Sequence, residues 1–416
     1  DELHEAQRKW INPETGEVTF SEPNDGNTNF DYQEGIKWNI NGGEMDNGLT
    51  ERNLFYQTQI FWGNTFGKHD ITAMGVFNRT ENAKGGEFTH YREDWAFRAT
   101  YAYGGRYFLE YNGAYNGSEK FSKDNRFAFF NSGAIGWMVS EEKFFEPLKK
   151  YIGMLKFRYS YGEVGDDNVG KRWLYATQWA YGGTTQHGLD ADIRSPYTWY
   201  KESEVGNMDV HWEKAVKQNF GIDYSFFDGL LAGSLDFFHE NRKDILIDGA
   251  SRAVPYYFGT APPTINYGRV SSHGYELEMR VNKVLNNGMR LWGNFNMTHA
   301  VSKIKKFDDA EFLPDYQKTA GFAIGQFHSY LSNGYANTWD EVIAMTPHNT
   351  NNDQKLPGMY NIIDYNGDGV IDTNDSAPYG FTDTPQNTYS ATIGWEWKGF
   401  SITAIFEPFS ISFNKF

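Results

Sequence analysis

The chain has 416 residues, no cysteine and a formal net charge of -16. Without cysteine there are no disulfides, and an acidic balance without clustered Lys and Arg argues against a nucleic-acid partner. The mean hydropathy of -0.65 and the lack of a long apolar run exclude membrane-spanning helices, so a closed β-barrel is the only remaining way for this chain to cross a membrane.

Residues 1–50 are polar and rich in Asn, Gly and Asp, and they predict a loop region with a short hairpin around Trp10 to Phe20. Residues 51–416 are predicted to form barrel strands and extracellular loops, because several segments in this range alternate with a period of two, which is typical of β-strands. The period predicts about 12 strands. They form six pairs: 54–62 with 70–78, 95–103 with 107–115, 126–139 with 154–161, 220–226 with 231–237, 275–281 with 291–297, and 389–397 with 400–406.

The second pair shows the pattern most clearly. Each run is about 9 to 11 residues long, the length that a tilted strand needs to cross a bilayer, whereas an ordinary strand has about 5 to 6. A lipid-facing wall with a wet interior is favoured, and the alternative is a half-buried hairpin in a soluble sandwich. The apolar face of this pair consists of Trp95, Phe97, Ala99, Tyr101, Tyr103, Tyr107, Leu109, Tyr111, Gly113 and Tyr115.

Short turns alternate with long excursions, of which the longest cover 162–210 and 304–387. Outer-membrane barrels have this arrangement of periplasmic turns and extracellular loops. We therefore predict an all-β fold, a transmembrane antiparallel β-barrel with long extracellular loops. Because a charge on the lipid face costs about 2 to 4 kcal/mol at the midplane, polar strand residues are expected to line the lumen: Arg98, Glu110, Asn112, Arg158, Glu276, Glu278 and Arg280.

Residues 116–145 carry a strand-loop-strand motif with Asn125-Arg126-Phe127, then Gly136-Trp137, then an acidic Ser-Glu-Glu. Together with further stretches scattered over 54–406, this motif resembles the SusC/RagA-like TonB-dependent outer-membrane transporters of Bacteroidetes. The resemblance implies a 22-stranded barrel in the outer membrane of a Gram-negative bacterium, plugged by an N-terminal domain and energised through TonB. It also implies a SusD-like surface lipoprotein as a lid, and we expect a dimer of transporter–lipoprotein pairs.

The chain departs from this family pattern, since we find no plug domain and no TonB box, and about 12 strands fall short of the family number. We therefore interpret 51–416 as the C-terminal barrel portion of a transporter, with its TonB contact in the missing N-terminal part. The implied function is TonB-dependent import of oligosaccharides or oligopeptides. The alternatives are a soluble or surface all-β carbohydrate-binding protein and a passive porin.

The sharpest chemical motif is DYNGDGVIDTND, which matches the spacing of a calcium-binding loop of the EF-hand type. Hard oxygen ligands at this spacing suit Ca²⁺, although an Asp replaces the usual Glu at the last position. A structural calcium ion in an extracellular loop is the favoured interpretation, and an Asx-rich turn without metal is the alternative. The predicted ligands are Asp364, Asn366, Asp368, Val370, Asp372 and Asp375.

The loops also carry aromatic residues that could stack on sugars or peptides at a barrel mouth, although packing against neighbouring loops is the commoner role of such residues. The candidates are Trp173, Trp179, Tyr181, Trp199, Tyr200, Tyr256 and Tyr257. The sequence contains no H-E-x-x-H, no G-x-S-x-G and no phosphate loop, so we expect no enzymatic activity.

Overall fold

The computed structural model describes residues 7–12, 14–21, 33–34, 50–85, 88–168, 171–184, 198–260 and 262–410. The chain divides into two compact units, one of residues 1–53 and 82–89 and the other of residues 54–81 and 90–416. Residues 51–53 and 82–89 thus belong to the first unit, although the sequence assigns them to the barrel region 51–416. Among the described residues, no helix is long and apolar enough to span a bilayer.

The first unit contains a small antiparallel sheet of order β2-β1-β3, formed by β1 (Gln7–Ile11), β2 (Val18–Ser21) and β3 (Gln33–Glu34). Trp10 lies opposite Thr19, so the hairpin expected in this region is present. The turn is held by the side chain of Asn12, whose oxygen accepts a hydrogen bond of 2.9 Å from the amide of Glu14.

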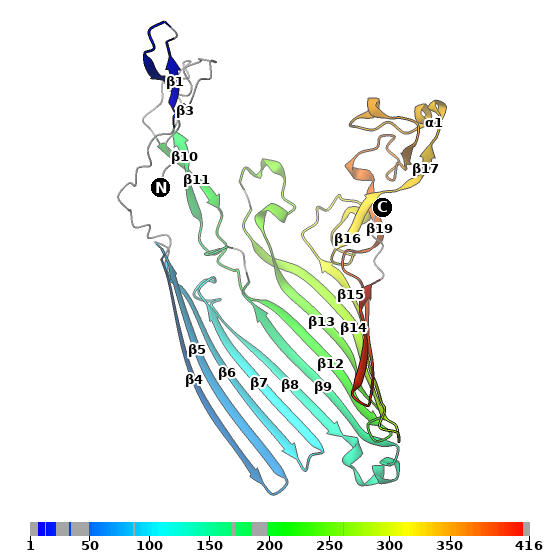
Figure 1. Cartoon of the computed structure of the whole chain (residues 1–416). Coiled ribbons are helices and arrows are strands. Elements are labelled where there is room, and N and C mark those ends of the chain that lie inside the picture. The colour runs from blue at the N-terminus through cyan, green and yellow to red at the C-terminus, as the bar shows by residue number, and fades with distance from the viewer. Residues whose placement is uncertain are drawn as a thin grey trace. The chain divides into compact units, whose positions relative to one another are not determined.

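A 12-stranded antiparallel sheet dominates the described part of the chain, and its strands follow one another in chain order (Figure 1). The number agrees with the prediction. The strands are β4 (Glu51–Phe66), β5 (His69–Lys84), β6 (His90–Tyr103), β7 (Tyr107–Ser118), β8 (Phe127–Met138), β9 (Ile152–Asp166), β12 (Glu213–Phe226), β13 (Leu231–Ile247), β14 (Ile265–Val284), β15 (Arg290–Lys306), β20 (Asn387–Trp397) and β21 (Phe400–Ser410).

Most of these strands are longer than predicted. β14 has 20 residues where the sequence predicts 275–281, and β12 begins at Glu213 where the sequence places its start at Phe220. The period-two signal ends where both faces of a strand become polar, but the backbone hydrogen bonds between strands continue beyond that point. The first long excursion consequently begins after Asp166.

The strand connections are of two kinds, and they lie at opposite ends of the sheet because successive strands are antiparallel. One end has the turns within the six predicted pairs, of which the longest joins β8 to β9 through two 3₁₀ helices, η2 (Val139–Glu141) and η3 (Lys143–Leu148). The other end, called the long-loop end below, carries the excursions between pairs.

The excursions have elements of their own. The first contains the hairpin of β10 (Gln178–Thr184) and β11 (Thr198–Glu204). The connection between β13 and β14 contains η4 (Gly249–Ser251) and η5 (Tyr256–Phe258). The last excursion contains η6 (Asp315–Gln317), β16 (Gln326–Tyr330), β17 (Ser332–Ala336), α1 (Trp339–Ala344), η7 (Asn352–Gln354), β18 (Met359–Ile362), η8 (Thr373–Asp375) and β19 (Ser376–Thr382).

A compact aromatic core lies under the loops at the long-loop end. Phe121 and Val210 are completely buried, and the Trp212 ring packs on Phe121 with ring centroids 5.3 Å apart. The Trp212 indole nitrogen donates to the carbonyl oxygen of Arg126 at 3.1 Å. These contacts fix the roots of two loops on β8 and β12. The sequence does not show them, because the residues lie outside any periodic strand pattern.

Candidate functional site

The two faces of the 12-stranded sheet differ in chemistry. The apolar face presents one continuous row of aromatic and aliphatic side chains across neighbouring strands, and Ile135 within it is 57% exposed. This wide exposed apolar surface is expected of a wall that contacts lipid rather than of a soluble core. The row, strand by strand from β6 to β14, is Tyr101, Leu109, Ile135, Tyr159, Phe220, Phe237 and Tyr275.

The opposite, polar face carries the charged residues that the sequence assigns to the lumen. On β6 and β7, Arg98 donates to Glu110 at 2.8 Å, and the other carboxylate oxygen of Glu110 accepts from Asn112 at 2.9 Å. On β14, the guanidinium of Arg280 donates to Glu278 through Nε at 2.7 Å. These charges are therefore paired along or between adjacent strands.

Arg158 is the centre of a network on the polar face that joins three strands, β9, β12 and β13. Its Nε donates to both carboxylate oxygens of Asp223 at 3.2 and 3.3 Å, and its Nη2 donates to Asp236 at 2.6 Å. Asp236 also accepts from the amide of Asn219 at 2.7 Å, and its side chain is only 14% exposed. A charge with this little access to water requires such partners.

The network depends on the glycine between its partners. Arg158 on β9 lies opposite Gly221 on β12, and Gly221 lies opposite Asp236 on β13. A Cβ added at Gly221 would lie 2.4 Å from the guanidinium carbon of Arg158. Because Gly221 has no side chain, Arg158 can extend from β9 over β12 and reach Asp236 on β13. Glu276 lies opposite Asp236 on the next strand and extends the same polar row.

Sequence reasoning named Arg158 but missed its two acidic partners. Asp223 and Asp236 occupy polar positions of predicted strands, so the period-two pattern does place them on the polar face. The strand register that brings them to Arg158 is a tertiary property, because the residues are 65 and 78 positions away along the chain.

The loop aromatics are divided among several places. On the β10–β11 hairpin, Trp179 and Tyr200 are 62% and 63% exposed, and Tyr200 forms an edge-to-face pair with Tyr181 at 6.2 Å. The Trp199 ring lies against Gly182 of the same hairpin, where an added Cβ would come within 2.5 Å of it. Several aromatic rings of this hairpin are therefore exposed. Loop aromatics that pack against neighbouring loops would be more buried than these.

The other aromatic candidates lie apart from that hairpin in the sequence. Trp173 is half-buried, with the guanidinium of Arg172 stacked 4.6 Å from its ring centroid. Tyr257 is highly exposed in the connection between β13 and β14. The side chain of Tyr256 lies outside the described residues. The structure thus brings Trp179, Tyr181, Trp199 and Tyr200 together on one hairpin.

The predicted metal loop is folded by hydrogen bonds from its own backbone. Asp364 accepts from the amide of Gly367 at 2.7 Å. Asp375, which is fully buried, accepts from the amides of Tyr365 at 2.7 Å and Asp372 at 2.8 Å. In the described ranges, no three His, Cys, Asp or Glu side chains are grouped as ligands for one ion.

The remaining predicted ligands lie on the exposed side of this loop. The amide of Asn366 donates to Asp368 at 2.9 Å, and Asp368 accepts from the backbone of Val370 at 2.9 Å. The oxygen donors are of the type that calcium prefers, and an oxygen that accepts one amide bond keeps a second lone pair. Calcium binding at this loop stays a prediction.

The comparisons with known proteins agree with this geometry. No family model matches the chain. TonB-dependent receptor P3 of Formosa agariphila is 26% identical over 324 residues, which are 74% of this chain and 31% of that protein. TonB-dependent receptor SusC of Bacteroides thetaiotaomicron is 27% identical over 302 residues, 68% of this chain and 27% of that protein. The solved structure of the RagAB peptide transporter matches with a TM-score of 0.66 at 18% identity, over 85% of this chain and 40% of that chain.

The chain is similar to the barrel portion of SusC/RagA-like TonB-dependent receptors. The predicted fold, an all-β antiparallel barrel wall, is thereby confirmed, and the place of this SusC/RagA-like chain is the outer membrane of a Gram-negative bacterium. These relatives are named as a TonB-dependent receptor and a peptide importer, as expected for a transporter rather than an enzyme. The SusC/RagA-like chain spans about a third or less of the length of the curated relatives it matches.

Proposed function

We propose that this chain forms the wall of an importer that moves oligosaccharides or oligopeptides across the outer membrane, driven through TonB. The match of its 12-stranded sheet to the RagAB peptide transporter over 85% of the chain carries the proposal. Solved structures of the RagAB peptide importer include an 'open-open' and a 'closed-closed' state. Likeness to SusC, a TonB-dependent receptor, supports the coupling to TonB.

The polar face would serve as the inner lining of the import path. Several of its charges are paired, as in the contacts of Arg158 with Asp223 and Asp236, and these pairs offer hydrogen-bonding groups without a local excess of charge. A path of this kind must bind its cargo well enough to admit it and weakly enough to release it. Paired charges meet both needs better than isolated ones, which would hold a charged cargo tightly.

The long-loop end would receive the substrate. The exposed rings of Trp179 and Tyr200 offer flat apolar surfaces that suit sugar faces and peptide side chains. We propose that a SusD-like surface lipoprotein covers this end, and that the complete assembly is a dimer of transporter–lipoprotein pairs. Size-exclusion chromatography with light scattering of the complex purified from native membranes would test the stoichiometry.

Uptake measurements test the import itself. Cells that produce the full-length transporter should accumulate a labelled oligopeptide or a labelled oligosaccharide, and deletion of TonB should reduce this uptake to the background. A peptide signal without a sugar signal would assign the substrate class. Uptake that persists unchanged without TonB would identify a passive porin and overturn the proposal.

A pair of aromatic substitutions tests the substrate contact. Trp179→Ala combined with Tyr200→Ala should weaken binding about tenfold, because an aromatic stacking contact contributes about 0.5 to 1.5 kcal/mol. Phe312→Ala is the control, since Phe312 is 95% exposed in the last excursion. Equal affinities of the two variants, measured by isothermal titration with the transported substrate, would remove these rings from the site.

A further inference from the structure

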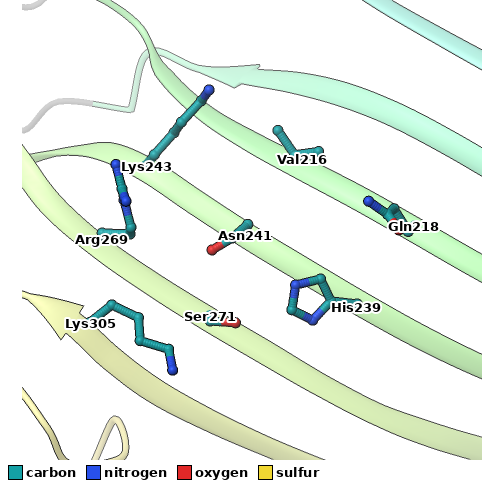
Figure 2. A pocket seen from close by; sticks show the side chains of 8 residues that line it. All are labelled: Val216, Gln218, His239, Asn241, Lys243, Arg269, Ser271 and Lys305. Carbon is teal, nitrogen blue, oxygen red and sulfur yellow. The ribbon is translucent and has the colours of Figure 1, made fainter.

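We propose that the apolar face of the sheet ends, toward the long loops, in a binding site for the phosphorylated headgroup of a lipid with a net negative charge in the outer leaflet. The site is an open groove of about 570 Å³ across four strands, β12 to β15. Figure 2 shows Lys243, Arg269 and Lys305 on one side of the smaller polar side chains of Asn241 and Ser271. The name basic groove is used below for the surface lined by these five residues.

The basic groove lies on the lipid-facing side of the wall. Asn241 and Lys243 follow Phe237 on β13 at even spacing, so their side chains share its face. Phe237 in turn lies in the apolar row, between Phe220 and Tyr275. The groove is therefore the direct continuation of the apolar face and not part of the polar lining.

The groove lies beyond Phe237, where this face of β13 becomes polar at His239 and Asn241. Four residues separate Phe237 from Asn241, and at about 3.3 Å per residue and a tilt of about 45° this is about 9 Å along the membrane normal. The groove lies toward the long-loop end, where outer-membrane barrels have their extracellular loops. A lipid beside this surface would place its acyl chains on the apolar face and its headgroup in the groove.

One rung of the sheet carries four cations in succession. Lys214 lies opposite Lys243, Lys243 opposite Arg269, and Arg269 opposite Lys306. Like charges directly opposite each other destabilise a sheet. This rung occurs in a chain with 54 acidic and only 38 basic residues, so it does not follow from the average composition.

The two outer cations of the rung have partners within the protein. Lys214 forms an ion pair with Glu163 at 3.2 Å, and Lys306 lies 3.6 Å from the centroid of the Tyr267 ring. In the part of the chain that the structure describes, no carboxylate lies within 4 Å of Lys243 or Arg269.

Lys305 is a third cation in the basic groove, beside Lys243 and Arg269. The register of β14 and β15 shifts between Arg269 and Val270, and this bulge leaves Lys305 unpaired in the ladder. A bulge changes the direction of a side chain, and here Lys305 lines the groove. No described carboxylate lies within ion-pair distance of it. Three cations for which no ion pair is found among the described residues therefore line one open groove.

A phosphate group can accept hydrogen bonds from these residues and neutralise their positive charges. An arginine fork binds phosphate oxygens in a bidentate manner, lysines add point charge, and the amide and hydroxyl of Asn241 and Ser271 can donate further hydrogen bonds. A free anion would not use the adjoining apolar face. A lipid would use both, because basic groups near a membrane surface attract anionic headgroups.

The full-length transporter in a non-ionic detergent provides the test. Native mass spectrometry would count bound phosphatidylglycerol and phosphatidylcholine for the wild type and for the triple variant Lys243→Gln, Arg269→Gln, Lys305→Gln. We expect the wild type to prefer phosphatidylglycerol, and the triple variant to bind it at least tenfold more weakly. The matched control removes three cations elsewhere, by Lys149→Gln, Lys171→Gln and Lys318→Gln, and should stay within twofold of the wild type.

Thermal unfolding without lipid provides a second readout. Because the variant loses opposed like charges, it should melt at or above the wild-type temperature in detergent alone, and only the wild type should gain stability from phosphatidylglycerol. Equal binding of phosphatidylcholine, or inorganic phosphate that binds as tightly as the lipid, would overturn the proposal. So would a triple variant that binds normally, or one whose only change is its oligomeric state, which would mark an interface between copies. Unchanged substrate uptake by the variant would separate this site from the proposed import.

Discussion

The arginine network shows how one missing side chain can organise a polar surface. Arg158 reaches Asp236 only because Gly221 leaves its path open. Gly221→Ala should displace the guanidinium and leave a poorly hydrated carboxylate without its partner. We expect a loss of about 1 to 3 kcal/mol in the free energy of unfolding, measured by urea titration in detergent. Gly75→Ala is the control, because no heavy atom lies within 4 Å of the added Cβ, and an equal loss in both variants would contradict this account.

At the turn end of the sheet, Glu142 is the acceptor at the centre of a second network of side-chain hydrogen bonds. Its carboxylate accepts a hydrogen bond from the Tyr107 hydroxyl, one of 3.1 Å from Trp137 and one of 3.2 Å from Arg106. The hydrogen bond from Tyr107, followed by that from Trp137 and the charge of Arg106, lowers the pKa of Glu142 below its ordinary value of 4.5.

The sign of the pH effect follows from this shift. A carboxyl with a lowered folded-state pKa stabilises the fold above its ordinary pKa, and this contribution is lost as the pH falls through the lowered value. The melting temperature of the wild type should therefore fall more steeply below pH 4.5 than that of Glu142→Gln. Parallel melting curves of the two proteins from pH 3 to pH 7 would show that Glu142 does not contribute.

At the scale of one element, β6 separates lipid from the polar lining by alternation alone. Ala99 lies on the apolar face, opposite Tyr111, and Ala96 lies on the polar face, opposite Ala114. Ala99→Arg should destabilise the folded barrel by about 2 to 4 kcal/mol, whereas Ala96→Arg should change the stability little. The fraction of heat-modifiable protein in outer membranes measures the difference, and equal tolerance of both substitutions would contradict the assigned faces.

The acidic loop is a second element whose role can be tested directly. Tyr365 lies inside it and can sensitise terbium emission, terbium being a luminescent substitute for calcium. The wild type should give emission that calcium displaces, and Asp368→Asn should weaken the response because one charged oxygen ligand is lost. Asp315→Asn, which removes a carboxylate paired with Lys318 outside the loop, is the control. Absence of emission at millimolar terbium would favour the metal-free turn.

At the scale of the whole molecule, the order of short turns and long excursions gives the wall two different ends. The turn end has short connections, of which the longest contains η2 and η3. The long-loop end carries the exposed aromatic hairpin of β10 and β11. Among the described strands, β4 and β21 each pair on one side only. Since an open edge in hydrocarbon leaves backbone groups without partners, these two strands are where the wall must be continued or closed.

The sequence by itself determined the fold class, the number of strands in the sheet and the face to which each side chain belongs. These depend on a period of two, which is a local property of an extended backbone and is visible without a partner strand. It also determined the short turns, because the residues that form them are adjacent in the chain.

Only the tertiary structure decided which residues from different strands and loops are neighbours. The partners of Arg158, the aromatic core around Trp212 and the row of cations from Lys214 to Lys306 all join residues from different strands or loops. The strand lengths were also decided there, since hydrogen bonds between neighbours extend the ladder beyond the apolar pattern. The physical reason is the same in each case: the register between strands is set by pairing across the sheet, and no single strand contains it.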